Sequence, residues 1–274
     1  MLNKKPHALH TLLETRFALE ALAHLSSKPL ERLLPVGDGH PVLVIPAFLT
    51  SDILTASLRH SLATLGYNPY PWKLGVNTGL HQHKLNALQH RLAAIVRQHG
   101  QKVTLVGWSL GGLYARALAA LDPENVRQVV TLGSPFAIPD TDSSGVQSFV
   151  GRAFSLLNGS GEDPMLKQPE LWQTTPTVPC SNIFTQRDGV VHWHYCVDEK
   201  RAQSENIRVP GSHVGLTHNP AVLYLLADRL KQPENAWRPF LARGWHEQRL
   251  FDNRTCATAI AMTDTTNPAS PIPA

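Results

Sequence analysis

The sequence predicts an α/β protein with a mostly parallel sheet that helices cover on both faces. Two observations support this prediction. Short apolar runs that suit buried strands alternate along the chain with longer segments whose apolar residues recur at helical spacing. In addition, the sequence Gly-Trp-Ser-Leu-Gly at 107–111 joins one such run directly to one such helix. Ligands of such sheets bind at the carboxyl ends of the strands, and Ser109 is expected at this edge.

The first expected element is a helix over residues 7–26. Its apolar residues fall on one stripe, which we expect to pack on the surface of the domain. The alternative is a helix that lies on a membrane surface, although Glu14 and Glu20 dilute its positive face. The residues of the stripe are Leu9, Leu12, Leu13, Phe17, Ala21 and Leu25.

The strands and helices of the sheet follow in alternation. Gly100 is expected to end the helix before the serine turn, and Asn219 with Pro220 is expected to begin the last one. Leu54 is placed on the buried face of its helix. The strands are predicted near 41–47, 67–72, 103–106, 126–132, 180–185 and 206–209. The helices are predicted near 54–65, 80–98, 113–121 and 219–230.

These elements divide the chain into four parts. An N-terminal helical segment over 1–35 precedes a core formed by 36–135 and 179–232. Between the two halves of the core, residues 136–178 are rich in Ser, Asp, Gly and Pro, and a connection of this length is typical of a functional cap or lid. Residues 233–274 form a C-terminal extension, whose Thr-, Pro- and Ala-rich end is expected to be disordered.

The composition is that of an ordinary globular protein. Of the 274 residues, 42% are hydrophobic and 17% are charged, and the formal net charge is +4. The basic residues are scattered along the chain rather than gathered into an arm, so no nucleic-acid partner is predicted. The oligomeric state stays open.

The cysteines and the N-terminus favour a cytoplasmic protein. Cys180, Cys196 and Cys256 form no Cys-x-x-Cys pair, and their odd number favours reduced thiols, with a Cys180–Cys196 bridge as the alternative. Lys4 and Lys5 resemble the start of a signal peptide, but charged residues interrupt the stretch after them. No run is long enough to span a membrane.

The Ser109 turn has the features expected of a nucleophile. A serine between a strand and a helix is held in a strained conformation with its hydroxyl exposed. Glycine two residues before and two residues after it avoids a clash at the tight turn. The N-terminus of the following helix favours negative charge, so the N–H of Leu110 is the natural first donor to an oxyanion. The alternative is a glycine-rich turn with an incidental serine.

A serine hydroxyl near neutral pH needs a base that accepts its proton, and the base needs a group that orients it. Asp188 and His213 suit these roles because each lies just beyond a predicted strand. The order along the chain is then Ser, Asp, His. Asp140 and Asp142, in the long insertion, are rival acids.

The chain from about residue 41 to residue 230 resembles an α/β-hydrolase-fold serine esterase or lipase. The motifs that carry the resemblance are Gly-Trp-Ser-Leu-Gly-Gly at 107–112, Asp-Gly-Val-Val at 188–191 and Gly-Ser-His-Val-Gly-Leu at 211–216. The resemblance implies the α/β-hydrolase fold and a catalytic triad in which Ser109 attacks, His213 takes its proton and Asp188 holds the imidazole.

The family also draws a second oxyanion donor from the loop after an early strand. That loop reads Pro46-Ala47-Phe48 and lacks the His-Gly sequence that is frequent in the family. The resemblance therefore implies the N–H of Phe48 as the second donor beside that of Leu110. Loss of one such donor typically costs about 2.7–4 kcal/mol of barrier stabilisation.

The insertion at 136–178 contains one amphipathic patch, over residues 146–157. It follows a strand that ends near Gly133, on the same edge as Ser109. We expect a cap that forms much of an acyl pocket, and packing of the patch on the body is the alternative. The candidate pocket residues are Trp108, Phe149 and Phe154.

Two histidine pairs have the spacing of metal ligands. They are His81 with His83 and His192 with His194. Neither pair has a third ligand in a suitable context, so no metal site is predicted. His218 is interpreted as part of the approach to the last helix.

Together these features predict a serine hydrolase that cleaves a small-molecule or lipid carboxylic ester through an acyl-enzyme, without a cofactor. An acyltransferase that uses the same triad and a non-catalytic binding protein of the same fold are the alternatives. The natural ester, its acyl length and any contact with a membrane surface stay open.

Overall fold

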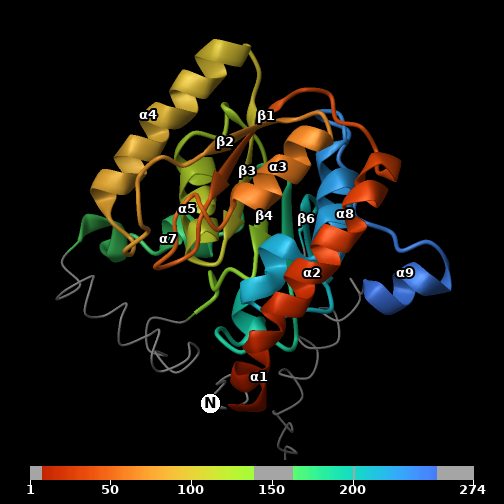
Figure 1. The fold of residues 1–274 in the computed structure, drawn as a ribbon. Coiled ribbons are helices and arrows are strands. Elements are labelled where there is room, and N and C mark those ends of the chain that lie inside the picture. Colours follow the sequence, from red (N-terminus) through yellow and green to blue (C-terminus); the bar gives the residue numbers. More distant parts are fainter. Residues whose placement is uncertain (1–7, 139–162, 200, 252–274) are drawn as a thin grey trace, which may run out of the picture.

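The computed structural model describes residues 8–138, 163–199 and 201–251. Within these residues, six parallel strands form one sheet in the order β2-β1-β3-β4-β5-β6 (Figure 1). All strands except the edge strand β2 consist almost entirely of buried residues, as expected for parallel strands covered on both faces. The strands are β1 Pro41–Ile45, β2 Asn68–Pro71, β3 Val103–Trp108, β4 Val126–Leu132, β5 Cys180–Phe184 and β6 Ser204–Arg208.

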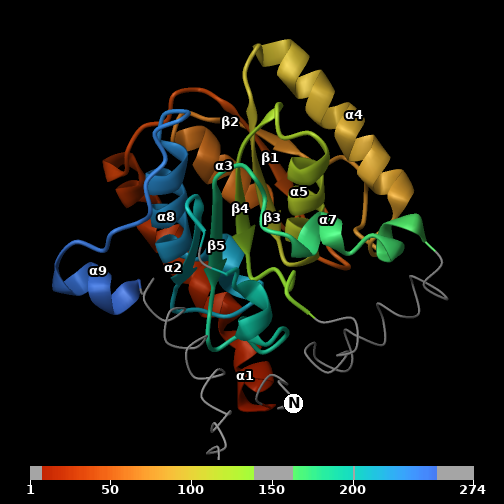
Figure 2. The ribbon, with the colours of Figure 1, turned by 180° about the vertical axis from the view of Figure 1, so that it is seen from behind.

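Two helical layers cover the sheet because side chains along each strand alternate between its faces. Val42 and Val44 of β1 pack in one cluster with helices α3 and α8, whereas Leu43 and Ile45 pack in another with α4 and α5. Figures 1 and 2 show these layers from opposite sides. The helices are α3 Ala56–Thr64, α4 Gln82–His99, α5 Leu110–Leu121 and α8 Pro220–Leu230. The predicted α/β architecture is confirmed.

The order of the strands reverses between β1 and β3. The chain passes from β1 to β2 on one side and then crosses back to β3 on the other. Ile45 and Gly107 are paired where these two strands end. In open parallel sheets a crevice forms at such a point, and ligands bind there. The loops after β1 and β3 therefore meet at the edge where a site is expected.

The helix ends follow their local signals. Gly100 ends α4 in the left-handed region at φ 63°, as predicted. Asn219 begins α8, and its side chain accepts a hydrogen bond from the N–H of Ala221. The prediction for Leu54 is wrong: this residue is exposed because α3 begins only at Ala56.

The N-terminal segment is helical as predicted, but the predicted packing stripe is wrong. Leu9, Phe17 and Leu25 of that stripe are exposed. The inner face instead carries Glu20 and His24, which hydrogen-bond to the domain beneath. Loop backbone groups under the helix need partners, and polar side chains supply them where leucines cannot. The elements of the segment are α1 Ala8–Leu13, η1 Glu14–Arg16, α2 Phe17–Ser27 and η2 Lys28–Leu33.

Most of the predicted cap lies outside the described residues. The structure describes two short helices of the insertion, η4 Pro164–Lys167 and α7 Glu170–Gln173, which pack against α4 and α5 respectively. The amphipathic patch at 146–157 is not among the described residues, so the cap stays a prediction. The same holds for the disorder predicted at the C-terminal end.

The C-terminal extension continues as α9, Gly244–Leu250. Glu247 of this helix accepts a hydrogen bond from the Tyr224 hydroxyl of α8 over 2.5 Å.

The two described cysteines, Cys180 and Cys196, are buried free thiols, so the alternative of a bridge between them is wrong.

Candidate active site

Ser109 lies at a sharp turn between β3 and α5. Its backbone has φ 51° and ψ −120°, a conformation that residues with a side chain rarely adopt. A Cβ on Gly107 would lie 2.4 Å from the Cα of Gly112, and a Cβ on Gly111 would lie 2.3 Å from the carbonyl oxygen of Ile45. The glycines are therefore required, and Gly111 is required by its contact with β1 rather than with Gly107.

Hydrogen bonds hold the backbone of Ser109 in place but do not involve its hydroxyl. The N–H of Ser109 donates to Leu132 over 2.8 Å, and its carbonyl oxygen accepts from Gly112 over 2.9 Å. The hydroxyl does not cap α5 and forms no hydrogen bond with another described residue. The oxygen therefore keeps its full capacity to interact with a ligand or a base.

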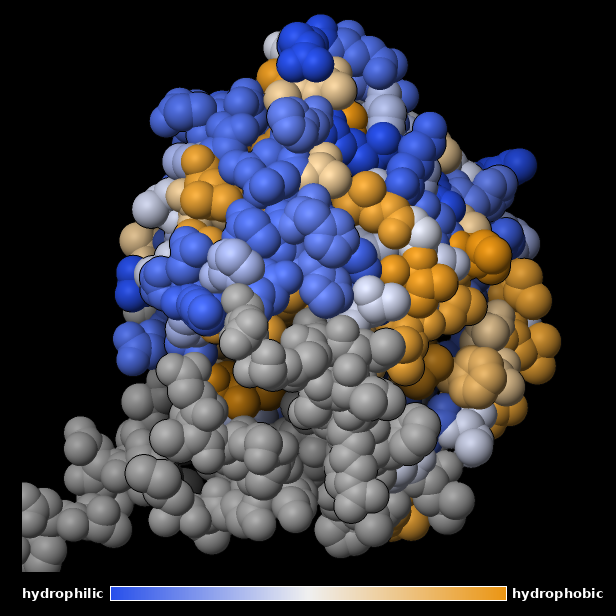
Figure 3. All heavy atoms as spheres, turned by 90° about the vertical axis from the view of Figure 1, so that its left-hand side faces the viewer, coloured by the Kyte–Doolittle hydropathy of each residue, from blue (hydrophilic) through white to orange (hydrophobic). Residues whose placement is uncertain are grey.

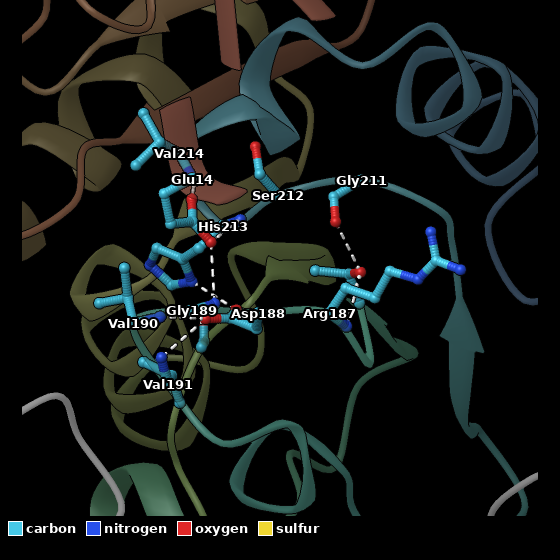
Figure 4. A network of polar contacts seen from close by, with 12 residues as sticks. Glu14, Arg187, Asp188, Gly189, Val190, Val191, Gly211, Ser212, His213 and Val214 are labelled. Carbon is cyan, nitrogen blue, oxygen red and sulfur yellow. Dashed lines mark hydrogen bonds and ion pairs between the residues drawn. The ribbon is translucent and has the colours of Figure 1, made fainter. Parts of the chain in front are cut away.

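Asp188 and His213 form a buried pair at the same edge of the sheet (Figure 4). Nδ1 of His213 lies 2.6 Å from Oδ2 of Asp188, and their side chains are only 4% and 1% exposed. Oδ1 of Asp188 accepts the N–H groups of Val190 and Val191 over 2.9 and 2.7 Å. Both carboxylate oxygens are thus satisfied, and the pairing through Nδ1 leaves Nε2 on the other side of the ring.

The surroundings of His213 raise the pKa of its imidazole above the ordinary value of 6.5. Burial alone lowers this pKa, but the charge of Asp188, the hydrogen bond that the ring donates to Asp188 and the charge of Glu14 together outweigh burial. The protonated ring is therefore stabilised, which is what a general base needs once it has taken a proton.

Ser109 and His213 both adjoin the end of β4. The N–H of Ser109 donates a hydrogen bond to Leu132, the last residue of β4. Gly133 follows Leu132, and a Cβ on Gly133 would lie 3.1 Å from Nδ1 of His213. Trp108 donates its indole N–H to the carbonyl oxygen of His213 over 3.2 Å. The structure therefore brings the serine turn and the histidine loop together, although they are far apart in the sequence.

The two predicted oxyanion donors lie on facing sides of the point where the strand order reverses. Leu110 is the first residue of α5. Phe48 follows β1, whose end contacts Gly111. The next residue, Leu49, has φ 58° and donates its N–H to the carbonyl oxygen of Asn77 over 2.7 Å. The oxyanion role of both N–H groups stays a prediction.

A carboxylate that the sequence reading did not assign joins the acid and base loops. Oε1 of Glu14, in η1, accepts the N–H of Gly189 over 2.8 Å and that of His213 over 3.0 Å (Figure 4). Oε2 accepts the N–H of Val214 over 3.0 Å. Because Gly189 follows Asp188 directly, one side chain connects the loops of both members of the buried pair.

Two further residues of the N-terminal segment hold the same loops. Glu20 accepts the N–H and the hydroxyl of Ser212 over 2.8 and 2.9 Å. Arg16 donates to the carbonyl oxygens of Arg187 and Gly211 over 3.1 and 2.7 Å. In the sequence the only signal of these roles is that charged residues interrupt an apolar helix.

Only one predicted pocket residue is among the described residues. Trp108 is buried and packs in one core cluster with Leu132. Phe149 and Phe154 lie outside the described residues, as do the rival acids at 140 and 142. The pocket roles of all three aromatic residues stay predictions.

Within each of the two histidine pairs the rings are stacked. The ring centroids of His81 and His83 are 5.3 Å apart, and those of His192 and His194 are 4.8 Å apart. Across the residues that the structure describes, no three His, Cys, Asp or Glu side chains gather in a way that would hold a metal ion. Nor does any helix in this part of the chain combine the length and hydrophobicity needed to cross a bilayer.

A cavity of about 170 Å³ lies at the opposite edge of the sheet. Its lining includes Val126 at the start of β4, Pro179 just before β5 and Trp237. Because parallel strands all begin at that edge, the length of the sheet separates this cavity from Ser109. None of the candidate catalytic residues lines it.

Comparisons with known proteins agree with the fold. A sequence model of the alpha/beta hydrolase fold family matches residues 68–176, which include the Ser109 turn. Aspergillus fumigatus lipase B is similar in structure, with a TM-score of 0.57 at 14% identity over 72% of this chain and 54% of that one. The monoacylglycerol lipase of Paleococcus ferrophilus has a TM-score of 0.48 at 13% identity, over 71% of this chain and 96% of its own. No curated protein matches the sequence.

The chain therefore has the α/β-hydrolase fold. Its parallel sheet and its serine at a strand-to-helix turn agree with that fold. At the identities observed, the structural likeness establishes the fold alone, and many chemistries share this fold. The reaction and its substrate have to be argued from the residues of the site.

Proposed function

We propose that the protein is a serine hydrolase that cleaves a carboxylic ester through an acyl-enzyme on Ser109. The observation that carries the proposal is the buried Asp188–His213 pair beside a serine whose hydroxyl the fold leaves unused. A histidine oriented by a carboxylate is the base that a serine nucleophile needs. The match of residues 68–176 to the alpha/beta hydrolase fold model supports a hydrolytic reaction at this edge of the sheet.

In the proposed mechanism, Oγ of Ser109 attacks the ester carbonyl while Nε2 of His213 takes the hydroxyl proton. Asp188 keeps the ring in the required tautomer and stabilises the imidazolium. The proton then passes from His213 to the departing alcohol, which leaves an acyl-enzyme. Water attacks that acyl group, with His213 again as the base, and Ser109 recovers its proton as the acid leaves.

The negative charge that develops on the carbonyl oxygen requires donors that are already in place. We assign this role to the N–H groups of Leu110 and Phe48. Leu110 begins α5, where unpaired N–H groups and the helix dipole favour an anion. Phe48 belongs to the loop beside it, across the close contact between Gly111 and the end of β1.

Labelling with a fluorophosphonate probe tests the nucleophile directly. We expect one equivalent of probe on the wild type, located at Ser109 by peptide mass spectrometry, and none on Ser109→Ala. Labelling of another serine, or no labelling of a folded protein, contradicts the assignment and favours a non-catalytic binding protein.

A graded series of acyl esters then defines the substrate class. The neighbour of highest TM-score named above is a lipase, so longer acyl esters belong in the series beside short ones. Product analysis with water alone and with an added alcohol separates the two enzymatic alternatives. Release of free acid in both conditions supports the hydrolase, whereas predominant transfer to the alcohol identifies an acyltransferase.

A further inference from the structure

The acid and base loops share a support that lies far from both in the sequence. We propose that Glu14 is a positioning residue, which keeps Asp188 and His213 in register from the N-terminal segment. The inference rests on the proposed function, since it requires that these two residues act together. Glu14 itself does not touch the reacting atoms.

The geometry of Glu14 supports this role. Its carboxylate accepts three backbone N–H groups, those of Gly189, His213 and Val214, over 2.8 to 3.0 Å. Hydrogen bonds to an ionised acceptor are stronger than those between neutral groups. Every donor is a member of the buried pair or the immediate neighbour of one. A small shift of either loop would therefore change the geometry between Asp188 and His213.

The loops are shaped to admit the N-terminal segment closely. A Cβ on Gly189 would lie 2.4 Å from the carbonyl oxygen of His10, so only glycine fits the acid loop beneath α1. A Cβ on Gly215, in the base loop, would collide with the carboxylate of Glu20. Both loops thus carry a glycine where the segment approaches, independently of the hydrogen bonds of Glu14.

Glu14 also acts on His213 through its charge. Burial lowers the pKa of His213, and the charges of Asp188 and Glu14 raise it. The other charged groups at these loops are Glu20, bonded to Ser212, and Arg16, bonded to backbone carbonyls. Neutralising Glu14 removes a negative charge and should lower the pKa of His213, which a purely structural role would not do.

The chain offers a graded set of variants for the test. Glu14→Gln keeps the shape but removes the charge, and Glu14→Ala removes the bonds as well. Glu20→Gln removes the charge that holds Ser212 of the base loop and that pairs with Arg16 over 3.7 Å. Glu31→Gln is the matched control, because Glu31 is a buried carboxylate of the same segment that accepts from Ser61 and touches neither loop.

We expect kcat to fall by roughly 10²-fold in Glu14→Ala, the size of effect that a misplacement of about 1 Å produces, and by less in Glu14→Gln. KM should change little. The acid limb of kcat/KM should move to lower pH in Glu14→Gln and stay in place in Glu31→Gln. Thermal unfolding of every variant shows whether lost activity reflects lost folded protein.

The outcomes separate this inference from the proposed function. If the wild type neither binds the fluorophosphonate nor cleaves esters, the proposed function fails and the inference fails with it. If the wild type is active but the Glu14 variants match Glu31→Gln in kcat and in pH profile, only the positioning role is overturned. Should Glu14→Ala not fold, Glu14→Gln decides through its pH limb.

The opposite face of the same segment carries a second, independent observation. Leu19, Leu22 and Leu25 of α2 are 69%, 60% and 59% exposed, and Leu30 and Leu33 of η2 are exposed as well. Figure 3 shows hydrophobic side chains gathered along its right-hand edge, which is the side that faces the viewer in Figure 1, where α2 and α3 lie. Contiguous apolar surface of this kind marks a binding face.

The charges on this segment indicate what binds there. Its carboxylates all point inward: Glu14 and Glu20 bond to the base loop, and Glu31 bonds to Ser61. η2 adds two cations to this segment, of which Arg32 is exposed and Lys28 is half-buried. The outer face is therefore apolar and cationic, which complements an anionic lipid surface. The dilution by Glu14 and Glu20 expected from the sequence does not occur.

We infer that the outer face of α2 and η2 docks on an anionic lipid bilayer. The docking would hold the carboxyl edge of the sheet near a lipid surface, because the inner side of α2 contacts the base loop. The inference does not depend on the proposed function, since binding can be measured without catalysis.

Co-sedimentation with vesicles tests the docking. The wild type should sediment with phosphatidylcholine vesicles that contain phosphatidylglycerol, less so in high salt and less so with phosphatidylcholine alone. The double variant Leu22→Glu/Leu25→Glu should bind at least about tenfold more weakly, because each leucine contributes about 1.5–3 kcal/mol on full burial. Leu121→Glu is the control, an exposed leucine at the end of α5 in the other helical layer.

No sedimentation of the wild type, or equal binding by the double variant and the control, overturns the docking proposal. Light scattering identifies the competing occupant. A wild-type dimer that the double variant dissociates would assign the face to a second copy of the chain and would also overturn the lipid proposal.

Discussion

Asp188 and Asp198 are both buried carboxylates beyond β5, yet their surroundings differ. Asp198 forms a bidentate pair with Arg116 at 2.8 and 2.9 Å and also accepts from Thr175 and Asn182. Every partner is a permanent donor. Asp188 instead divides its oxygens between two backbone N–H groups and one imidazole.

The two carboxylates differ in whether their partner can exchange a proton. The Arg116 guanidinium keeps its charge at any ordinary pH, and its remaining N–H groups donate to the carbonyls of Trp172, Gln173 and Thr174. Arg116, which is paired with Asp198, therefore connects residues 172–174 to α5. The imidazole of His213, by contrast, can gain and lose a proton, and it has a second ring nitrogen beyond Asp188. Burial and pairing alone do not distinguish the two carboxylates, whereas a titratable partner beside a candidate nucleophile supports the role proposed for Asp188.

The largest effect is expected from the loss of the proposed nucleophile or of the proposed base. Ser109→Ala and His213→Ala should each lower kcat on the order of 10⁶-fold, and the double variant should be little worse, because residues that act as a unit are not additive. Ser109→Ala should change the free energy of unfolding by less than about 1 kcal/mol, since the removed hydroxyl has no partner in the described residues. Steady-state kinetics and denaturant unfolding check both statements. Additive losses in the double variant would show that the two residues act separately.

Asp188→Asn should come next, with kcat about 10⁴-fold lower, because an amide cannot hold the productive tautomer of His213 or support its charge. The fold should survive, since the amide oxygen still accepts from Val190 and Val191. Kinetics on protein shown to be folded by circular dichroism measure the effect. Full activity in this variant would remove Asp188 from the mechanism.

Asp198→Asn should give the opposite pattern. It leaves Arg116 buried without its counter-ion, which typically costs about 3–5 kcal/mol of stability. The remaining folded molecules should keep the wild-type kcat, once activity is normalised to probe-labelled sites. A selective loss of kcat in a stable Asp198→Asn protein would contradict the division between the two carboxylates.

The pH dependence should separate the two pairs further. Burial lowers the pKa of His213, but Asp188 and Glu14 raise it above the ordinary value of 6.5. The acid limb of kcat/KM should therefore have its midpoint above 6.5. Activity falls as pH drops through the limb, because the base becomes protonated. The stabilisation linked to the raised pKa has the reverse sign: it is fully present below about pH 6.5 and is lost as pH rises through the folded-state pKa. Asp188→Asn should shift the limb downward and Asp198→Asn should not, which kcat/KM profiles measure.

The sequence was sufficient for the sheet, the Ser109 turn and the location of the Asp188–His213 pair because these depend on local patterns. Alternating apolar runs, glycines around one serine and polar residues after strands can all be recognised within a few positions. Gly100 and Asn219 were predictable for the same reason, since a cap is a local hydrogen-bonding arrangement.

The N-terminal segment could not be predicted in the same way. The contacts of Glu14 and Glu20 join residues separated by more than half of the chain, and no local pattern records them. The helical stripe predicted that leucines face the domain. The loops beneath offer unpaired N–H groups, however, and these require carboxylates, so the helix turns its polar side inward. The pair of Arg116 and Asp198 was not predicted either, because it also joins residues that are far apart in the sequence.

The smallest expected effect concerns the two thiols, each of which neighbours one of the compared carboxylates. Cys180 lies 3.9 Å from Nη1 of Arg116, and burial raises its pKa to about 12. Burial and then the charge of Asp188 raise the pKa of Cys196. A shift from 9 to about 12 lowers the thiolate fraction of Cys180 at pH 8 roughly a thousand-fold. In a Cys256→Ser background, Ellman's reagent should therefore react with no thiol of the folded protein and with both Cys180 and Cys196 after denaturation. Added reductant should leave activity unchanged. Rapid reaction of Cys196 in the folded protein would mean that the loop around Asp188 opens to solvent, so that the Asp188–His213 pair is held less firmly than the Arg116–Asp198 pair.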